Sequence, residues 1–465
     1  MVSPSFAVSQ TSNLHGTRTR VSPGQPRERL RATLKGPAPK TLGVLGLLAV
    51  ALPINLAITG LALLRKTKQD SPQDLQASGQ TILITGGKMT KALHLARCFH
   101  RAGHRVILAE SEKYRLTGHR FSRDVDQFHA TPTPGAVGYI EAIAQIVAQE
   151  HVDLWVPVSS PASSVFEAEA AAELGIPVVH GKPEIVRRLD DKEELVRMAG
   201  EAGLPVPEAH RITDPAQVAP LVDASTCRYI LKSIAYDPLH RLDLTPLPRA
   251  TRELTEAFAY SKPITAETPW VLEELLDGEE ICTHATAIDG VVRLHVCCDS
   301  SAFQVNYEHL DRPEVEAWVA QFVAHHRITG QISFDFIIDE SGTVRPIECN
   351  PRTHSAITVC EDYKAVAQAY LNTSEHRVLP GSDARSTYWL YHELWRMMAD
   401  PRRIPERLKI IAAGHDAIFD WEDPLPFLLV HHLQIPALLL ASLRSGKDWI
   451  RIDFNIGKLV ETGGD

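Results

Sequence analysis

The sequence lacks the patterns that mark several classes of protein. Its seven cysteines include no CxxC pair and no regular spacing, which argues against a disulfide framework and fits a reducing compartment. Lysine and arginine total 48 against 57 acids, a formal net charge of -9, so the chain has no overall basic character and we expect no nucleic-acid partner. A hydrophobic fraction of 44% excludes a chain that is disordered throughout.

Acidic residues are scarce at the N-terminus, and charge is absent just after it. Residues 1–40 contain seven Lys/Arg and a single acid, Glu28, among Ser, Thr and Pro, which predicts a disordered basic arm. Residues 42–64 carry no charge and as a helix would be roughly 34 Å long, so we expect a hydrophobic membrane segment over 41–65, with a buried core helix as the alternative. Both flanks are basic and Pro53 lies at the centre, so a transmembrane span and a hairpin in one leaflet both stay open. An organelle transit peptide in the arm also stays open.

After a linker over 66–80, strand and helix patterns alternate. Strands are predicted at 81–85, 105–110, 153–158 and 176–179, with helices starting near Met89 and over 137–149 and 161–174. Such alternation predicts a parallel α/β domain, here over 81–180. The turn Gly86-Gly87-Lys88, with Glu110 downstream, lacks the full GxGxxG of a dinucleotide site. A packing turn or a substrate-facing loop is therefore favoured there.

The pattern changes to mixed α and β from residue 181, which predicts an α+β domain over 181–375 and an extension over 376–465. Asp190-Asp191-Lys192 opens a helix that ends at Gly203. The later elements are strands at 229–233, 270–273, 281–288 and 290–297 and a helix at 313–326. In the extension, 425–443 is apolar but interrupted by His431 and His432, so a buried helix or a surface resting on a membrane is favoured over a second span.

The most informative stretch is TGQISFDFIIDESGTVRPIECNPRTHS, residues 329–355, which predicts a hairpin turning at 339–342. Residues two apart in a strand share a face, so Glu348 and Asn350 point the same way. Asp335 would join them if the partner strand places it opposite. These oxygen ligands suit Mg²⁺, which proteins usually hold with one or two carboxylates and substrate phosphates. A sheet edge with solvated acids is the alternative at this point.

Two lysines and two glutamates precede this hairpin. Lys192 opens a helix, and Lys232 closes the apolar run Tyr229-Ile-Leu, where a charge needs a partner that phosphate oxygens could supply. Glu273 and Glu280 lie seven residues apart, at the two ends of a linker that contains a glycine. The backbone of this linker could form hydrogen bonds with an adenine, and the carboxylate of Glu280 could accept hydrogen bonds from ribose hydroxyls. In the order Lys, Lys, Glu-x₆-Glu, Asp, Glu-x-Asn, these features resemble the ATP-grasp superfamily.

Longer blocks resemble one family within it, the mycosporine-glycine synthetases. They include GHRFS, YILKSI, GEEICTHATAIDG, IECNPRTHSAIT and the terminal DFNIGKLVETGGD, and the resemblance runs from about Thr81 to Asp465. It implies an ATP-grasp fold behind a pre-ATP-grasp α/β domain, and an ATP-dependent carbon–nitrogen ligase that condenses 4-deoxygadusol with glycine into mycosporine-glycine, ADP and phosphate. The cofactors would be ATP and Mg²⁺, with Mn²⁺ as an alternative. We expect a membrane-associated protein with its catalytic domain on the cytoplasmic side, and a homodimer is one option for its assembly.

The resemblance assigns roles to residues of this sequence. ATP contacts fall on Lys192, Lys232, Glu273, Glu274, Leu275, Leu276 and Glu280. Metal ligands are Asp335, Glu348 and Asn350; catalytic groups are Arg352 and Arg241; acceptor contacts are Ser300, Ser301, His354 and Ser355. The chain departs from the superfamily in having no glycine between Ser233 and Pro248, so we expect His240 or Arg241 to contact the phosphates instead of a glycine-rich backbone. Two rivals stay open: a ligase with another acceptor or amine, and a non-catalytic nucleotide-binding membrane protein.

Overall fold

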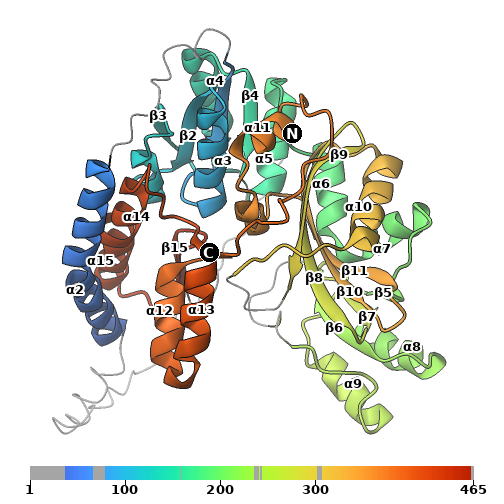
Figure 1. Cartoon of the computed structure of the whole chain (residues 1–465). Helices are drawn as coiled ribbons and strands as arrows, with labels where there is room; N and C mark the ends of the chain where they lie inside the picture. The colour runs from blue at the N-terminus through green and yellow to red at the C-terminus, as the bar shows by residue number, and fades with distance from the viewer. Residues whose placement is uncertain are drawn as a thin grey trace, which may run out of the picture.

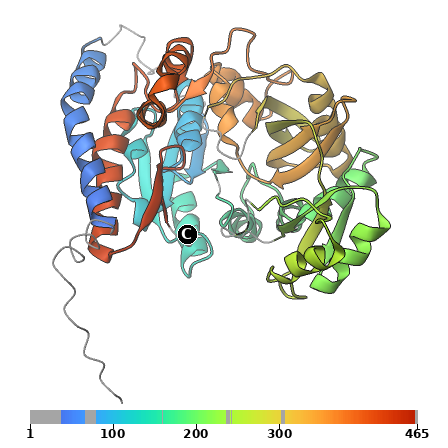
Figure 2. The same ribbon diagram turned by 90° about the horizontal axis from the view of Figure 1, so that it is seen from below.

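The computed structural model describes residues 37–65, 79–158, 160–234, 240, 243–300 and 306–461. Most of the predicted basic arm and of the linker over 66–80 lies outside these residues. Figure 2 shows two lobes. One contains the first and last parts of the chain, coloured blue, cyan and red, and the other contains the middle, coloured green to orange.

The first lobe is built on a parallel sheet in the order β3-β2-β1-β4. Its strands are β1 (Thr81–Thr85), β2 (Arg105–Ser111), β3 (Gln127–Thr131) and β4 (Leu154–Pro157), with helices α3 (Thr90–Arg101), α4 (Tyr139–Glu150) and α5 (Ser164–Leu174). The predicted alternation is confirmed because β1, β2 and β4 are apolar runs buried between helices. Prediction missed β3, and the strand expected at 176–179 is reduced to one bridge between Val178 and Trp155.

The second lobe contains two antiparallel sheets, as its mixed pattern predicted. One has the order β5-β7-β6 and the other β11-β10-β8-β9. The strands are β5 (Ala209–Ile212), β6 (Tyr229–Ser233), β7 (Trp270–Glu274), β8 (Glu279–Ile288), β9 (Val291–Asp299), β10 (Gly330–Ile338) and β11 (Val344–Asn350). The helices are α6 (Pro183–Asp190), α7 (Lys192–Glu201), α8 (Val218–Ala224), α9 (Arg252–Tyr260) and α10 (Pro313–His326). The apolar stripe of α10 is buried, with Trp318 packed against Phe334 and Phe336 of β10.

The C-terminal extension packs onto the first lobe and shares its core. Its elements are β12 (Thr387–Tyr388), α12 (Leu390–Ala399), α13 (Ile404–Ala413), β13 (His415–Asp416), α14 (Leu425–Leu429), a π-helical turn η7 (Val430–Gln434), α15 (Ile435–Ser445), β14 (Trp449–Asp453) and β15 (Lys458–Glu461). Helix α11 (Tyr363–Tyr370) precedes the extension and packs against α3. One apolar cluster joins Phe99 of α3 to Tyr370, Phe427 and Phe454. Residues 425–443, around His431, form a helix whose residues are buried or half-buried except Leu440 and Ala441, in line with the favoured prediction.

The N-terminal apolar segment is one uninterrupted helix, α2 (Pro37–Leu64). It continues through Pro53, which faces outward, so the hairpin alternative is wrong. Within the described residues two helices are long and apolar enough to cross a membrane by length and composition, Ala38–Leu64 and Leu425–Ser445. An 18-residue window of the first has a mean hydropathy of 2.3 with 22% of it buried, and the corresponding window of the second is 44% buried. In Figures 1 and 2 α2 lies alongside α15.

Candidate active site

The β10–β11 hairpin brings the predicted metal ligands together. Asp335 lies directly opposite Glu348, and Asn350, two residues further on, lies opposite Ser333. The three side chains therefore share one face of the sheet. Burial, followed by the charges of Glu348 and Glu280, raises the pKa of Asp335 to about 8. The charges of Arg352 and Lys232 offset this repulsion only in part, and a divalent cation would offset more of it.

The donor set fits Mg²⁺. Within the residues that the structure describes, no three Asp, Glu, His or Cys side chains form a ready-made cation cage. The hairpin instead offers two carboxylates and one amide. Because Mg²⁺ usually keeps waters and substrate phosphate oxygens among its ligands, such an incomplete set of protein ligands suits it.

Arg352 follows β11 and lies close to this acidic cluster. Its charge interacts with Asp190, Glu348 and Asp335, yet burial lowers its pKa below the usual value. The Nη1 atom is buried without a hydrogen-bond partner in the described chain. An unpartnered buried donor is costly, so a ligand that accepts a hydrogen bond from Nη1 would be favoured.

Lys232 and Glu273 lie on the paired strands β6 and β7 and form an ion pair of 2.6 Å. The side chain of Glu273 is 2% exposed and that of Lys232 is 19% exposed. The ammonium group of Lys232, at the end of the apolar run, therefore has a protein partner. The sequence had predicted phosphate oxygens as its partner. Lys232 is held in place by Glu273, with part of its surface still open to a ligand.

Glu280 lies next to the metal-ligand cluster, at the start of β8. It is opposite Ile337 of β10, and its carboxylate Oε1 accepts a hydrogen bond of 2.8 Å from Ser300 Oγ. Ser300, predicted for the acceptor pocket, thus contacts the residue predicted for the ribose. In the linker, the N–H groups of Glu274 and Leu275 already donate to the carbonyl groups of Glu208 and Arg228. These two N–H groups are therefore not free to donate to an adenine.

Comparison with known proteins identifies the fold. Neither a protein-family model nor a curated protein matches the chain by sequence. An N5-carboxyaminoimidazole ribonucleotide synthetase in complex with ADP superposes with a TM-score of 0.52 at 12% identity, covering 70% of this chain and 86% of its own. A biotin carboxylase from Campylobacter jejuni, in a β-γ-ATP complex, matches with 0.50 at 16% identity, covering 68% and 75%. The chain has the ATP-grasp fold.

A third structure with this likeness is the N5-carboxyaminoimidazole synthetase from Staphylococcus aureus complexed with ADP. Its TM-score is 0.50 at 14% identity, with 64% of this chain and 79% of its own covered. The likeness is one of fold, and the roles of individual residues rest on the geometry of this chain.

Within the ATP-grasp fold, Lys192 is the first residue of α7. The side chain of Asp191 caps this helix by accepting from the N–H groups of Glu193 and Glu194. Lys192 and Arg352 both interact with the charge of Asp190. Lys192 and Arg352 are therefore both near Asp190. Asp190 was not among the residues predicted for the site.

Sequence reasoning also missed Lys91, a buried lysine of α3. Its Nζ donates to the carbonyl of Thr353, so it links the α/β lobe to the turn that carries Arg352. Burial, followed by the charges of Arg352 and Lys88, lowers its pKa to about 7. The available signal was its place in the first turn of a helix after a buried strand, at the carboxyl edge of a parallel sheet where ligands bind.

His354 and Ser355, predicted to contact the acceptor, both have protein partners. Nδ1 of His354 accepts from the N–H of Ala356, and burial lowers the pKa of His354 to about 3. Oγ of Ser355 donates to Oδ1 of Asn455 at 2.9 Å. The Ser355–Asn455 bond attaches the C-terminal segment to the turn after Arg352. The acceptor role of both residues stays a prediction.

The Gly86-Gly87-Lys88 turn is a packing turn. The N–H of Thr90, at the start of α3, donates to the carbonyl of Asn455 at 2.8 Å, and Oγ1 of Thr90 donates to the carbonyl of Phe454. A Cβ at Gly457 would lie 2.3 Å from the carbonyl oxygen of Lys88. The C-terminal chain thus occupies the place that a pyrophosphate takes in dinucleotide sites, which supports the favoured alternative.

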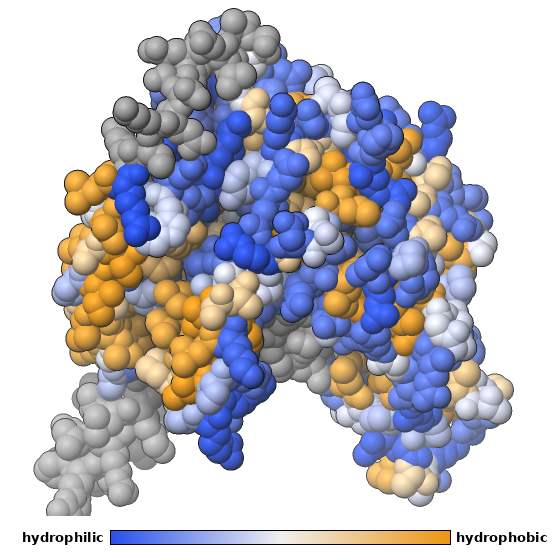
Figure 3. Space-filling model, in the orientation of Figure 1, coloured by the Kyte–Doolittle hydropathy of each residue, from blue (hydrophilic) through white to orange (hydrophobic). Residues whose placement is uncertain are grey.

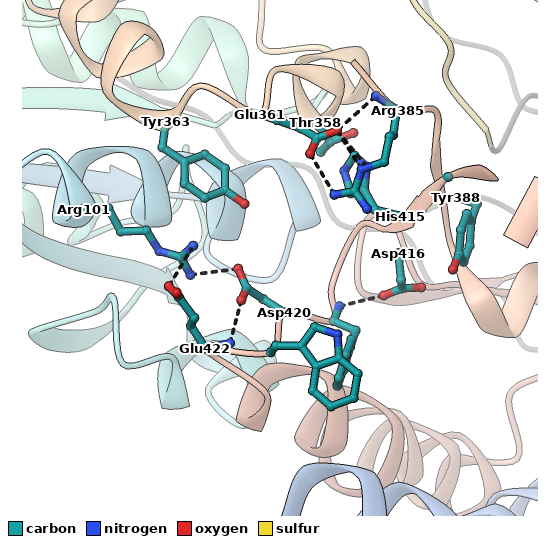
Figure 4. A pocket seen from close by; sticks show the side chains of 13 residues that line it. Arg101, Thr358, Glu361, Tyr363, Arg385, Tyr388, His415, Asp416, Asp420 and Glu422 are labelled. Atoms are coloured by element: carbon teal, nitrogen blue, oxygen red, sulfur yellow. Dashed lines mark hydrogen bonds and ion pairs between the residues drawn. The ribbon is translucent and has the colours of Figure 1, made fainter. Parts of the chain in front are cut away.

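A separate cavity of about 470 Å³ opens near the far end of α3 (Figure 4). Its charged side chains point toward one another in pairs. Arg101 contacts Asp420 at 2.8 Å, and Arg385 contacts Glu361 at 2.8 Å. No residue predicted for the site lines it, so it is distinct from the hairpin cluster.

Two predicted residues, Arg241 and Ser301, lie outside the described residues. His240 is described, and its ring packs against Trp270 with 5.6 Å between centroids. The expected phosphate contact from Arg241 therefore stays a prediction.

Proposed function

We propose that the chain is an ATP-dependent carbon–nitrogen ligase that joins 4-deoxygadusol to glycine, giving mycosporine-glycine, ADP and phosphate. The observation that carries the ATP-dependent part is the opposed pair Asp335 and Glu348 beside the unpartnered Nη1 of Arg352, within an ATP-grasp fold. The choice of acceptor and amine rests on the resemblance of GEEICTHATAIDG and IECNPRTHSAIT to the mycosporine-glycine synthetases.

In the proposed reaction, an acceptor oxygen attacks the γ-phosphorus of ATP and ADP leaves. The acceptor then carries a phosphate ester in place of a poor leaving group. The amine of glycine attacks the carbon that bears this ester, the C–O bond breaks, phosphate departs with the electron pair, and the nitrogen gives up a proton. Bound Mg²⁺ would neutralise phosphate charge. Enzymes of this kind contribute mainly positioning and charge neutralisation.

The chain supplies those contributions through named groups. Lys192 and Lys232 bind phosphate oxygens, and Glu273 holds Lys232 in position through their ion pair. Glu280, supported by Ser300, accepts from the ribose hydroxyls. Asp335, Glu348 and Asn350 hold the metal. Nη1 of Arg352 donates to the transferring phosphoryl group, with Arg241 as a second cation, and His354 and Ser355 border the acceptor.

The deciding experiment incubates the purified full chain in detergent with ATP, Mg²⁺, 4-deoxygadusol and glycine. A new near-ultraviolet chromophore with equimolar ADP supports the proposal. Formation of ADP only with another amine or acceptor supports the first rival, and absence of ADP under all conditions supports a non-catalytic nucleotide-binding membrane protein. Asp335→Asn serves as the matched inactive control.

We also propose that α2 attaches the enzyme to a membrane, with the catalytic lobes on the cytoplasmic side. Support comes from an 18-residue window of α2 that has a mean hydropathy of 2.3 and is 22% buried, so most of this apolar stretch is uncovered. Flotation of the full chain with lipid vesicles tests this attachment, and a chain that stays with the soluble fraction contradicts it.

A further inference from the structure

Helix α2 is held along its whole length against the first lobe. Contacts at its start, middle and end are Lys40 Nζ to the carbonyl of Ile450 at 2.9 Å, Asn55 Nδ2 to Tyr391 Oη at 2.7 Å, and Arg65 over the ring of Trp421 at 4.6 Å. Its neighbours along this path are α14, η7 and α15. A helix held at both ends and at its centre is part of the folded lobe.

This packing is incompatible with α2 crossing a bilayer. If α2 crossed, the α14–α15 segment beside it would have to cross as well. That segment is bound to the α/β lobe through Gln434, which accepts from the N–H of Gly118 at 2.8 Å and donates to the carbonyl of Gly457 at 2.8 Å. The polar loops of the first lobe that Gln434 contacts, at Gly118 and Gly457, would then be drawn into hydrocarbon. There they would lose their hydrogen-bond partners in water.

The face of α2 that points away from the lobe is wholly apolar. Its exposed large residues are Leu42 at 58%, Leu47 at 53%, Val50 at 75%, Ile54 at 63%, Leu56 at 51%, Ile58 at 36%, Leu61 at 47%, Leu63 at 51% and Leu64 at 85%. Steps of three, four and seven place Leu47, Val50, Ile54, Leu61 and Leu64 at the centre of this surface, and the other four widen it on its flanks. The opposite side, with Leu48, Asn55 and Thr59, is buried. Such a helix presents one long side to an apolar medium.

A second apolar surface is formed by the α12–α13 hairpin. Its exposed residues are Leu394 at 41%, Trp395 at 60%, Met398 at 56%, Ile404 at 37% and Leu408 at 53%. Figure 3 shows apolar residues gathered over α2 on the left and over the α12–α13 hairpin beside it. Two neighbouring apolar surfaces from distant parts of the sequence point to one common partner.

The charge of the hairpin indicates what that partner is. Residues 390–413 contain five Lys/Arg and three Asp/Glu, a net charge of +2 in a chain of net charge -9. Arg402 at the tip pairs with Asp400 yet keeps 89% of its side chain exposed. Exposed Trp and Leu beside basic residues are typical of a helix that lies in the interface of an anionic membrane.

We propose that α2 and the α12–α13 hairpin together bind one leaflet of an anionic lipid bilayer, with α2 lying in the membrane plane. This rests on the membrane attachment proposed above and replaces a span by an in-plane helix. Trp395 and Met398 enter the headgroup region, and Arg402 meets lipid phosphates.

The first test measures binding of the full chain to vesicles of phosphatidylcholine with and without phosphatidylglycerol. The variant Trp395→Ser/Met398→Ser/Leu408→Ser is expected to bind about tenfold more weakly or worse, because three exposed apolar side chains that would enter the membrane are lost. Its matched control is Leu254→Ser/Tyr260→Ser on α9, whose residues are 53% and 63% exposed in the other lobe. The control should bind like the wild type.

If the triple variant binds vesicles as tightly as the wild type, the proposed role of the hairpin is wrong. If the wild-type chain binds neither kind of vesicle, the proposed membrane attachment is wrong. ATP turnover of the triple variant in detergent, measured in parallel, should equal that of the wild type. Vesicle binding does not require turnover, so failure of the proposed ligase reaction is recorded separately.

The second test measures depth in the membrane. Six of the seven cysteines are buried, so a Cys227→Ser background allows single spin labels at Leu47→Cys, Ile54→Cys and Leu61→Cys. An in-plane helix places all three labels at the same shallow depth. Labels at successive depths that reach the bilayer centre and the far leaflet would overturn the proposal.

Discussion

Replacing Lys232 by methionine separates the structural role of this lysine from its proposed role in binding ATP. The substitution leaves Glu273, 2% exposed, as a buried charge without its partner at 2.6 Å. Breaking a buried pair from one side costs about 3–5 kcal/mol, and we expect the lower end, about 3 kcal/mol, because Lys232 is 19% exposed. For a lobe of this size the melting temperature should fall by roughly 6–12 °C.

The double variant Lys232→Met/Glu273→Leu removes both charges, so its stability should return to within about 1 kcal/mol of the wild type. Its ATP turnover should stay about 100-fold below the wild type, because the phosphate contact is still missing. Thermal unfolding and an ADP-release assay on wild type, both single variants and the double variant complete the cycle. Recovered turnover in the double variant would refute the phosphate role, and an unchanged melting temperature in Lys232→Met would refute the structural one.

Three other variants examine neighbouring parts of the site. Asp335→Asn relieves the opposed carboxylates, so the ligand-free chain should gain about 1 kcal/mol in calorimetry while turnover drops about 100-fold; full turnover contradicts the metal assignment. Lys91, with a pKa of about 7 when folded against 10.5 as a free side chain, is neutral in the fold and charged in the unfolded chain between these values. The contribution of Lys91 to stability should therefore rise from pH 7 to pH 9, so in denaturant titrations the wild type should gain stability relative to Lys91→Met over this range; equal slopes contradict this. Arg241→Ala should raise KM for ATP or lower kcat, and unchanged values of both would exclude its phosphate contact.

Local patterns predicted the elements whose environment is simple. Strands such as 81–85 are apolar throughout because they are buried on both faces, and the stripe of α10 faces a single sheet. The strand Gln127–Thr131 was missed because it lies at the sheet edge, where polar and half-exposed residues hide the pattern. The sharing of one core by α3 and the C-terminal extension depends on contacts between residues more than 300 apart, which no local pattern encodes.

The same difference between local patterns and long-range contacts applies to the site. The facing of Asp335 and Glu348 depends on a bulge between Asp335 and Phe336, which moves the partner of Asp335 from Ile347 to Glu348, so only the hairpin itself was predictable from its turn. The pairing of Lys232 with Glu273 was not, because it requires knowing that β6 and β7 are neighbours. Lys91 and Asn455 reach the turn after Arg352 from the two ends of the chain, so only the folded structure brings them there.

The most direct measurement of the central claim follows the acceptor oxygen. The full chain is incubated with ATP, Mg²⁺, glycine and 4-deoxygadusol labelled with ¹⁸O at the reacting carbon, and the phosphate released is analysed by ³¹P NMR. A phosphorylated acceptor predicts one ¹⁸O in each phosphate and one ADP for each mycosporine-glycine. Phosphate without ¹⁸O, from an acceptor that retains its label in a parallel incubation without enzyme, would contradict it.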